Sequence, residues 1–111
     1  MAGIAGILGG DNGELKQMLE KIHYRGPHET WINRESQVNL GCLELNVGGD
    51  CKPGAHHAVD NKIAVICDGR VYNPEKGSTT DAEALLALYK KYGIGFAGKV
   101  DGDFALSLIH I

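Results

Sequence analysis

Five side chains in the middle of the sequence are of types that can bind a metal ion. Imidazole, thiolate and carboxylate groups are all competent ligands for transition metals. The sequence carries such groups at Glu44, Cys51, His56, His57 and Asp68. Their spacing matches no standard ligand pattern, and adjacent histidines in a loop with glycine and proline are usually solvated. We therefore predict no metal site and no cofactor, with metal binding as the alternative.

Two carboxylates stand at the ends of predicted elements, where polar side chains often do chemistry. The run from Ile63 to Cys67 is apolar on both alternations, which predicts a strand buried on both faces. Asp68, followed by Gly69, ends this strand. Asp81 begins a predicted helix, where an acidic residue is also ordinary dipole chemistry. Both carboxylates are candidate site residues, and for Asp81 a structural role is the alternative.

The opening stretch "MAGIAGILGG" predicts a strand that begins at the terminus itself. Its glycines let neighbouring backbone approach closely, while Ile4 and Ile7 supply core. Removal of Met1 would make Ala2 the new N-terminal residue. The methyl group of Ala2 cannot attack, titrate or coordinate anything, so the side chain at this position offers no chemistry.

The elements that must position these residues follow from hydrophobic spacing and turn signals. A cap at Asp11 or Asn12, followed by apolar residues at helical spacing, predicts a helix of about three turns that ends near Gly26–Pro27. Short strands are expected over residues 30–33 and 38–45. Residues 46–54 form a predicted loop, because they are rich in glycine, proline and aspartate.

The second half of the sequence repeats this mixture of strands and a helix. Asp60–Asn61 between two apolar runs predicts a tight hairpin. Thr80 and Glu83 form a capping box that begins a helix, which Gly93 ends. The last stretch, "VDGDFALSLIHI", reads as a strand interior to a sheet. Because strands and helices do not alternate strictly, an α+β fold with mainly antiparallel sheets is favoured over a doubly wound one.

Composition narrows the class of protein. A chain of 111 residues, 43% of them hydrophobic, fits one small domain over residues 1–111. A net charge of -3 without a basic run argues against nucleic acid and anionic membranes as partners. We predict a cytoplasmic protein, since no membrane span or signal peptide is evident. Three cysteines without CxxC spacing are expected to be reduced structural thiols.

Five stretches, taken in order, resemble the signatures of a known family. The stretches "MAGIAGI", "YRGPH", "CDGRVYN", "TDAEALLALY" and "DGDFAL" are similar to those of class II glutamine amidotransferase domains, as found in asparagine synthetases. Their order and spacing are preserved over all 111 residues. The resemblance implies an N-terminal-nucleophile hydrolase-like fold, with antiparallel sheets layered with helices, in a form shortened at its C-terminus.

The resemblance also implies a mechanism and assigns roles to residues. In the family, an N-terminal cysteine uses its own α-amine as base, attacks the side-chain amide of glutamine and releases ammonia through a thioester. Ala2 falls on this nucleophile, and Gly69 on the oxyanion glycine. Asp81 falls on the aspartate that binds the substrate amine. Arg25 and Gly26 fall on the loop that supports the nucleophile.

Three further positions depart from the family pattern. Asp68 replaces the oxyanion asparagine, and its carboxylate would repel the developing charge unless it carried a proton. Glu44 replaces the substrate-binding arginine and would repel the carboxylate of glutamine. His28 replaces an aspartate in the supporting loop. With Ala2 as well, we expect no hydrolysis; either an amidotransferase has lost its nucleophile, or the chain is a pseudoenzyme that binds a ligand or self-assembles.

The implied partners are small molecules and protein chains. The ligand is glutamine or a related amide, and a separate synthetase chain could accept the ammonia. The apolar final strand would leave an unpaired edge, which soluble proteins avoid. We therefore predict a homodimer.

Overall fold

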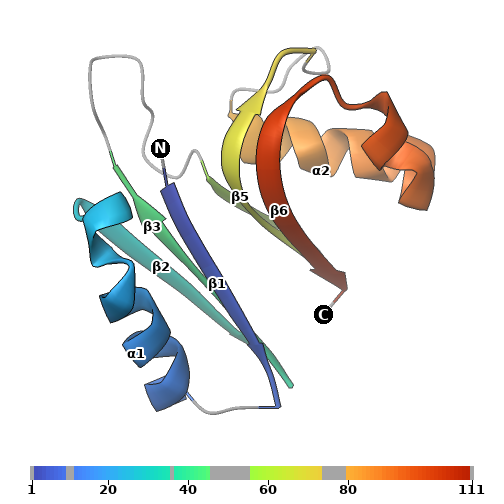
Figure 1. Cartoon of the computed structure of the whole chain (residues 1–111). Coiled ribbons are helices and arrows are strands. Elements are labelled where there is room, and N and C mark those ends of the chain that lie inside the picture. Colours follow the sequence, from blue (N-terminus) through green and yellow to red (C-terminus); the bar gives the residue numbers. More distant parts are fainter. Residues whose placement is uncertain (1, 10–11, 36, 46–55, 74–79, 111) are drawn as a thin grey trace.

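The structure is a computed structural model and describes residues 2–9, 12–35, 37–45, 56–73 and 80–110. Two antiparallel three-stranded sheets face each other, and one helix covers the outer face of each sheet (Figure 1). The layers therefore run helix, sheet, sheet, helix. This confirms the predicted α+β class with antiparallel sheets.

The first sheet has its central strand buried on both faces. It consists, in the spatial order β1-β3-β2, of β1 (Ala2–Leu8), β2 (Glu29–Glu35) and β3 (Val38–Glu44). Alternate residues of a strand point to opposite faces. On β3, Leu43 packs with Leu15 and Leu19 of helix α1 (Asn12–Lys21), whereas Cys42 belongs to the core between the sheets. The even-numbered residues of β3, such as Cys42, therefore point toward the second sheet.

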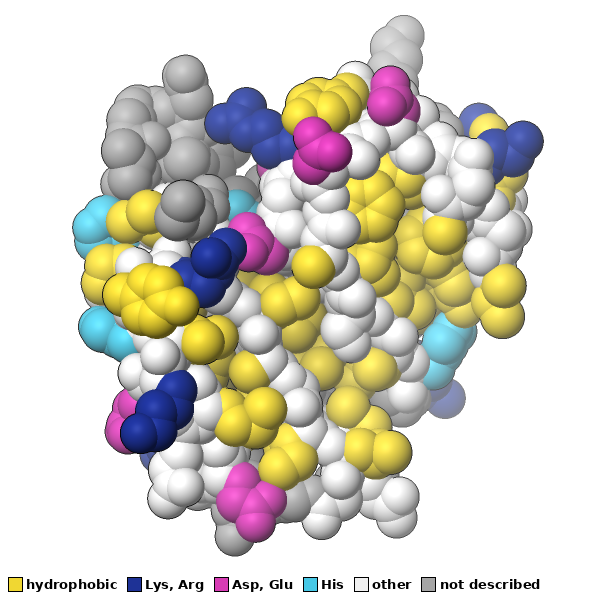
Figure 2. All heavy atoms as spheres, viewed as in Figure 1, with side chains coloured by type: hydrophobic (Ala, Val, Ile, Leu, Met, Phe, Trp, Pro, Cys, Tyr) yellow, Lys and Arg dark blue, Asp and Glu magenta, His cyan; other side chains and the backbone are white. Residues whose placement is uncertain are grey.

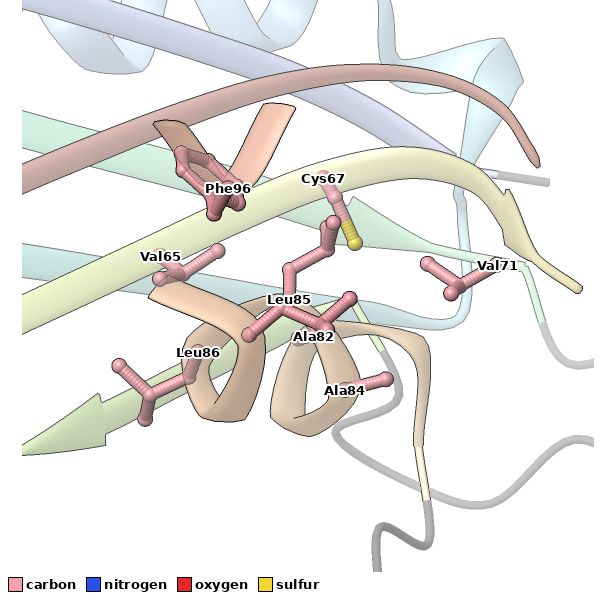
Figure 3. Packing of buried hydrophobic residues seen from close by; sticks show 9 residues of the cluster. Val65, Cys67, Val71, Ala82, Ala84, Leu85, Leu86 and Phe96 are labelled. Atoms are coloured by element: carbon pink, nitrogen blue, oxygen red, sulfur yellow. The ribbon is translucent and has the colours of Figure 1, made fainter. Parts of the chain in front are cut away.

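The second sheet repeats this arrangement. It consists, in the spatial order β4-β5-β6, of β4 (His57–Asp60), β5 (Ile63–Val71) and β6 (Gly102–His110). Val65 and Cys67 of β5 pack with Leu85 of helix α2 (Asp81–Tyr92), as Figure 3 shows. Ala64 and Ile66 face the first sheet instead. Asp68 continues this second alternation, so β5 carries its carboxylate on the side of the first sheet.

Helix α2 has the termini that the sequence predicted. The Thr80 hydroxyl oxygen accepts the backbone N–H of Glu83 at 3.2 Å, and Gly93 ends the helix with a φ of 65°. Short 3-10 helices follow each main helix, η1 over His23–Arg25 and η2 over Gly93–Lys99. No helix in the described part of the chain is long and apolar enough to cross a membrane.

The strand β5 is longer than predicted. The hairpin at Asn61 is confirmed, with a φ of 56°, but β5 does not end at Cys67. It continues to Val71, because β6 offers an antiparallel partner along its whole length and pairs Gly69 with Phe104. The predicted loop at 46–54 lies outside the described residues.

Gly69 occupies a position that another residue would strain. Its φ is 144°, and a Cβ would lie 2.0 Å from the backbone oxygen of Asp103. We expect Gly69→Ala to lower the free energy of unfolding by about 2 kcal/mol or more. The matched control is Gly95→Ala in η2, where a Cβ would meet nothing within 4 Å. Urea denaturation measures both, and equal losses in the two variants would contradict this account of Gly69.

Candidate functional site

The main chain of Ala2 is held by two side chains from distant segments. Its N–H donates to Asp68 Oδ1 at 3.1 Å, and its carbonyl oxygen accepts from Arg25 Nε at 2.9 Å. Arg25 Nη2 also donates to Asp68 Oδ2 at 2.5 Å, which closes a ring of contacts. Ala2 is fully buried, while the two charged side chains are half-buried. Three residues that the sequence singled out separately therefore form one network.

The contacts of Asp68 bear on the role of its carboxylate. Both oxygens accept hydrogen bonds, one from Ala2 and one from the Arg25 guanidinium. Both oxygens are therefore engaged as acceptors within the protein. Asp68 therefore anchors the start of β1 in this structure. The role of Asp68 at an oxyanion stays a prediction.

The loop after α1 packs directly against the end of β3. A Cβ on Gly26 would lie 2.5 Å from the carbonyl carbon of Leu43, so only glycine fits there without displacement. The backbone N–H of His28 donates to the carbonyl oxygen of Glu44 at 3.1 Å, and Pro27 forms a bridge with the same residue. This packing fixes the position from which Arg25 reaches Ala2.

Glu44 lies beside Ala2 at the end of the first sheet. It is the register partner of Ala2 on β1 and of Glu29 on β2, and its side chain is 1% exposed. Its Oε1 accepts the backbone N–H of His56 at 3.1 Å. The same oxygen lies 3.3 Å from His57 Nδ1 and 3.9 Å from His56 Nδ1. The carboxylate therefore lies close to two imidazole rings.

The surroundings of Glu44 shift the pKa values of two neighbouring side chains, Glu29 and His56. A hydrogen bond with Glu44, desolvation and repulsion between the two carboxyl groups raise the pKa of Glu29. Burial, followed by the positive N-terminus, lowers the pKa of His56 although Glu44 opposes this. The neutral imidazole of His56 is thus favoured.

The expectation that the two histidines are solvated is wrong. His56 is buried, and His57 is half-buried with its ring stacked on Trp31 at a centroid distance of 4.4 Å. The reason is that β4 begins at His57, whose pairing with Ile66 of β5 turns its ring toward the first sheet, while Nδ1 of both histidines lies within 4 Å of the buried Glu44 carboxylate. The structure also brings Cys42, a thiol that the metal-binding alternative did not include, together with Glu44 and His57. Cys51 lies outside the described residues.

Neither described thiol is in a form that could act as a nucleophile. Burial and the charge of Glu44 raise the pKa of the Cys42 thiol. Burial raises the pKa of the Cys67 thiol to about 12, with Asp81 and Asp68 contributing. Both side chains are therefore neutral thiols at pH 7, whereas the thiolate is the reactive form.

Gly69 and Asp81 lie on the second sheet and its helix. Gly69 follows Asp68 on β5, as the sequence requires. Asp81, the first residue of α2, accepts the backbone N–H of Val71 at 2.8 Å and so ties the helix to the end of β5. This contact gives Asp81 a structural role, and its binding of a substrate amine stays a prediction.

An apolar groove of about 380 Å³ begins farther along β1 from Ala2. Figure 2 shows apolar side chains gathered along the middle of this face. The groove is lined in part by Ile4, Leu8, Val38, Leu40 and Ile66. None of the described residues that line it is charged, so this described lining lacks the groups that would orient a polar amide.

Sequence comparisons show which known proteins the chain resembles. The profile of a family described as "Glutamine amidotransferase domain" matches residues 1–110. The chain is 28% identical over 106 residues to asparagine synthetase [glutamine-hydrolyzing] 2 of Bacillus subtilis, covering 85% of this chain and 14% of that protein.

Two fungal relatives carry a different name. The chain is 28% identical over 120 residues to amidase chry2 of Gibberella zeae, covering 87% of this chain and 18% of that protein. It is 29% identical over 111 residues to amidase chyE of Penicillium rubens, covering 86% of this chain and 16% of that protein. The chain thus spans less than a fifth of the length of these three relatives.

Proposed function

The chain belongs to the glutamine amidotransferase domain family, and from this premise we propose that it binds glutamine or a related amide at Ala2 without hydrolysing it. The observation that carries the proposal is the network that holds the main chain of residue 2 between Arg25 and Asp68. A domain of the N-terminal-nucleophile type needs its terminal residue fixed in this way. The side chain at that residue is a methyl group.

The missing chemistry can be stated atom by atom. In an active form, the sulfur of a cysteine at position 2 attacks the amide carbon while the α-amine takes the thiol proton. The carbon–nitrogen bond then breaks, the proton passes to the leaving ammonia, and water hydrolyses the thioester to a carboxylate and a thiol. Ala2 supplies no atom for the first step, so the cycle cannot begin.

The charge at Glu44 favours an amide other than free glutamine. We expect glutamine amide, in which a carboxamide replaces the α-carboxylate, to bind the metal-free protein about tenfold or more tightly than glutamine, because like charges repel across a binding site. Glu44→Gln removes that charge at constant volume and should abolish the preference. Isothermal titration calorimetry measures both affinities without interference from turnover.

The matched control for this experiment is Glu83→Gln, which removes a carboxylate from the first turn of α2. It should leave the preference between the two amides unchanged. If neither amide binds at millimolar concentration, amide binding is not the function of this site.

The second candidate function is a non-catalytic module for binding or self-assembly. It is favoured by the internal contacts of the two substituted carboxylates, since Asp68 binds Arg25 and Ala2 while Glu44 binds His56. Such contacts occupy the groups that would otherwise face a substrate. The homodimer, the cytoplasmic location and a synthetase that accepts ammonia stay predictions under either function.

A further inference from the structure

We propose that Cys42, Glu44 and His57 bind a zinc ion between the two sheets. The three side chains come from two strands in different sheets, β3 and β4. Each offers one ligand atom, and these atoms all lie within 4.8 Å of one another. A zinc ion there would join the sheets at the end where residue 2 is held.

The distances suit a zinc site after a small contraction. Zinc bonds of about 2.0 to 2.3 Å to oxygen, nitrogen and sulfur place tetrahedral ligands roughly 3.5 Å apart. Glu44 Oε1 and His57 Nδ1 are already 3.3 Å apart. The other ligand atoms must approach by about an ångström to reach this tetrahedral spacing.

Two imidazole nitrogens give an independent reason for a ligand here. The side chain of His56 is 6% exposed, and its Nδ1 has no hydrogen-bond partner in the described part of the chain. Nδ1 of His57 is buried and likewise lacks one there. Buried polar atoms normally have a partner, because leaving one without a hydrogen bond is costly. A cation beside Glu44 would satisfy His57, and His56 Nδ1 lies 3.9 Å from the same carboxylate.

The chemistry of the donor set selects the metal. Magnesium and calcium prefer oxygen ligands alone, whereas a mixture of sulfur, nitrogen and oxygen in a compact group is typical of zinc. On binding, Cys42 releases its thiol proton to solvent and coordinates as a thiolate. The charges of that thiolate and of the Glu44 carboxylate then balance the divalent ion, so no net charge is buried between the sheets.

Cobalt titration tests the site directly. The chain is purified without an affinity tag, stripped with a chelator and titrated with Co²⁺, whose absorption reports sulfur ligation and tetrahedral geometry. We expect one equivalent to bind, with a thiolate-to-cobalt charge-transfer band, and Zn²⁺ to displace it. Cys42→Ser should abolish that band. Glu44→Gln and His57→Gln should each weaken cobalt binding by at least about tenfold. Even the loss of a group that only hydrogen-bonds to a metal ligand typically weakens metal binding by that much.

Matched cysteine variants control the assignment. Cys67→Ala and Cys51→Ala keep all three proposed ligands, and both should leave the spectrum and the affinity unchanged. If Cys42→Ser does not fold, His57→Gln decides alone, because His57 is partly exposed. The proposal is overturned if Co²⁺ does not bind at micromolar concentration, if His57→Gln binds as tightly as the parent, or if the band depends on Cys51.

Discussion

An Ala2→Cys protein freed of Met1 is expected to release ammonia from glutamine or glutamine amide at least about a thousandfold faster than the Ala2 protein, because losing a catalytic nucleophile costs hydrolases even more than this. The structure gives the new sulfur a fixed backbone, since Arg25 and Asp68 hold residue 2. A coupled glutamate dehydrogenase assay measures the ammonia. Intact mass confirms that Met1 has been removed.

The control is Ala2→Ser, which has the same shape but a weaker nucleophile, and it should show little of the gain. A correctly processed cysteine variant that stays at the rate of the Ala2 protein on both amides would mean that amide hydrolysis is not the chemistry of this site. The second candidate function, a module for binding or assembly, would then stand.

The second large effect concerns Asp68 in the Ala2→Cys background. We expect Asp68→Asn to raise kcat of the cysteine variant by about a hundredfold, because a single oxyanion donor is worth about this much or more. An asparagine amide can donate to the developing oxyanion, whereas the Asp68 carboxylate repels it. The carboxylate also favours the protonated form of the neighbouring α-amine, and that form cannot act as base.

A pH profile separates these two contributions. The rate rises with pH as the α-amine loses its proton, so removal of the Asp68 charge should move that rise to lower pH. The matched control is Asp103→Asn on β6, a carboxylate that accepts from Tyr72 instead, and it should change neither rate nor profile. Equal kcat values with and without Asp68→Asn would show that this side chain does not act on the oxyanion.

Local signals in the sequence predicted much of the fold. The Thr80 cap, the Asn61 turn and the Gly93 stop depend on the residue itself and its close neighbours, and all three are confirmed. The length of β5 was not predictable in the same way, because the pairing of Asp68 and Gly69 depends on β6, far along the chain.

The candidate site likewise contains residues that sequence motifs predicted and residues that only tertiary packing brings together. The family resemblance singled out Ala2, Arg25 and Asp68 from their motifs, and the structure brings them together. No motif links Cys42 with His57, since they meet only when two sheets pack face to face. The sequence nevertheless indicated half of this group. Residues 42 and 44 are two positions apart on one predicted strand, so their side chains must lie on the same face.

The contact between Trp31 and His57 gives this molecule an optical reporter. Trp31 is the single tryptophan of the chain, so its emission has one source. Its indole lies against the imidazole with an interplanar angle of 10°, and the two rings come from opposite sheets. Fluorescence from this one ring therefore records whether the sheets stay in register at the end that holds residue 2, without any added label.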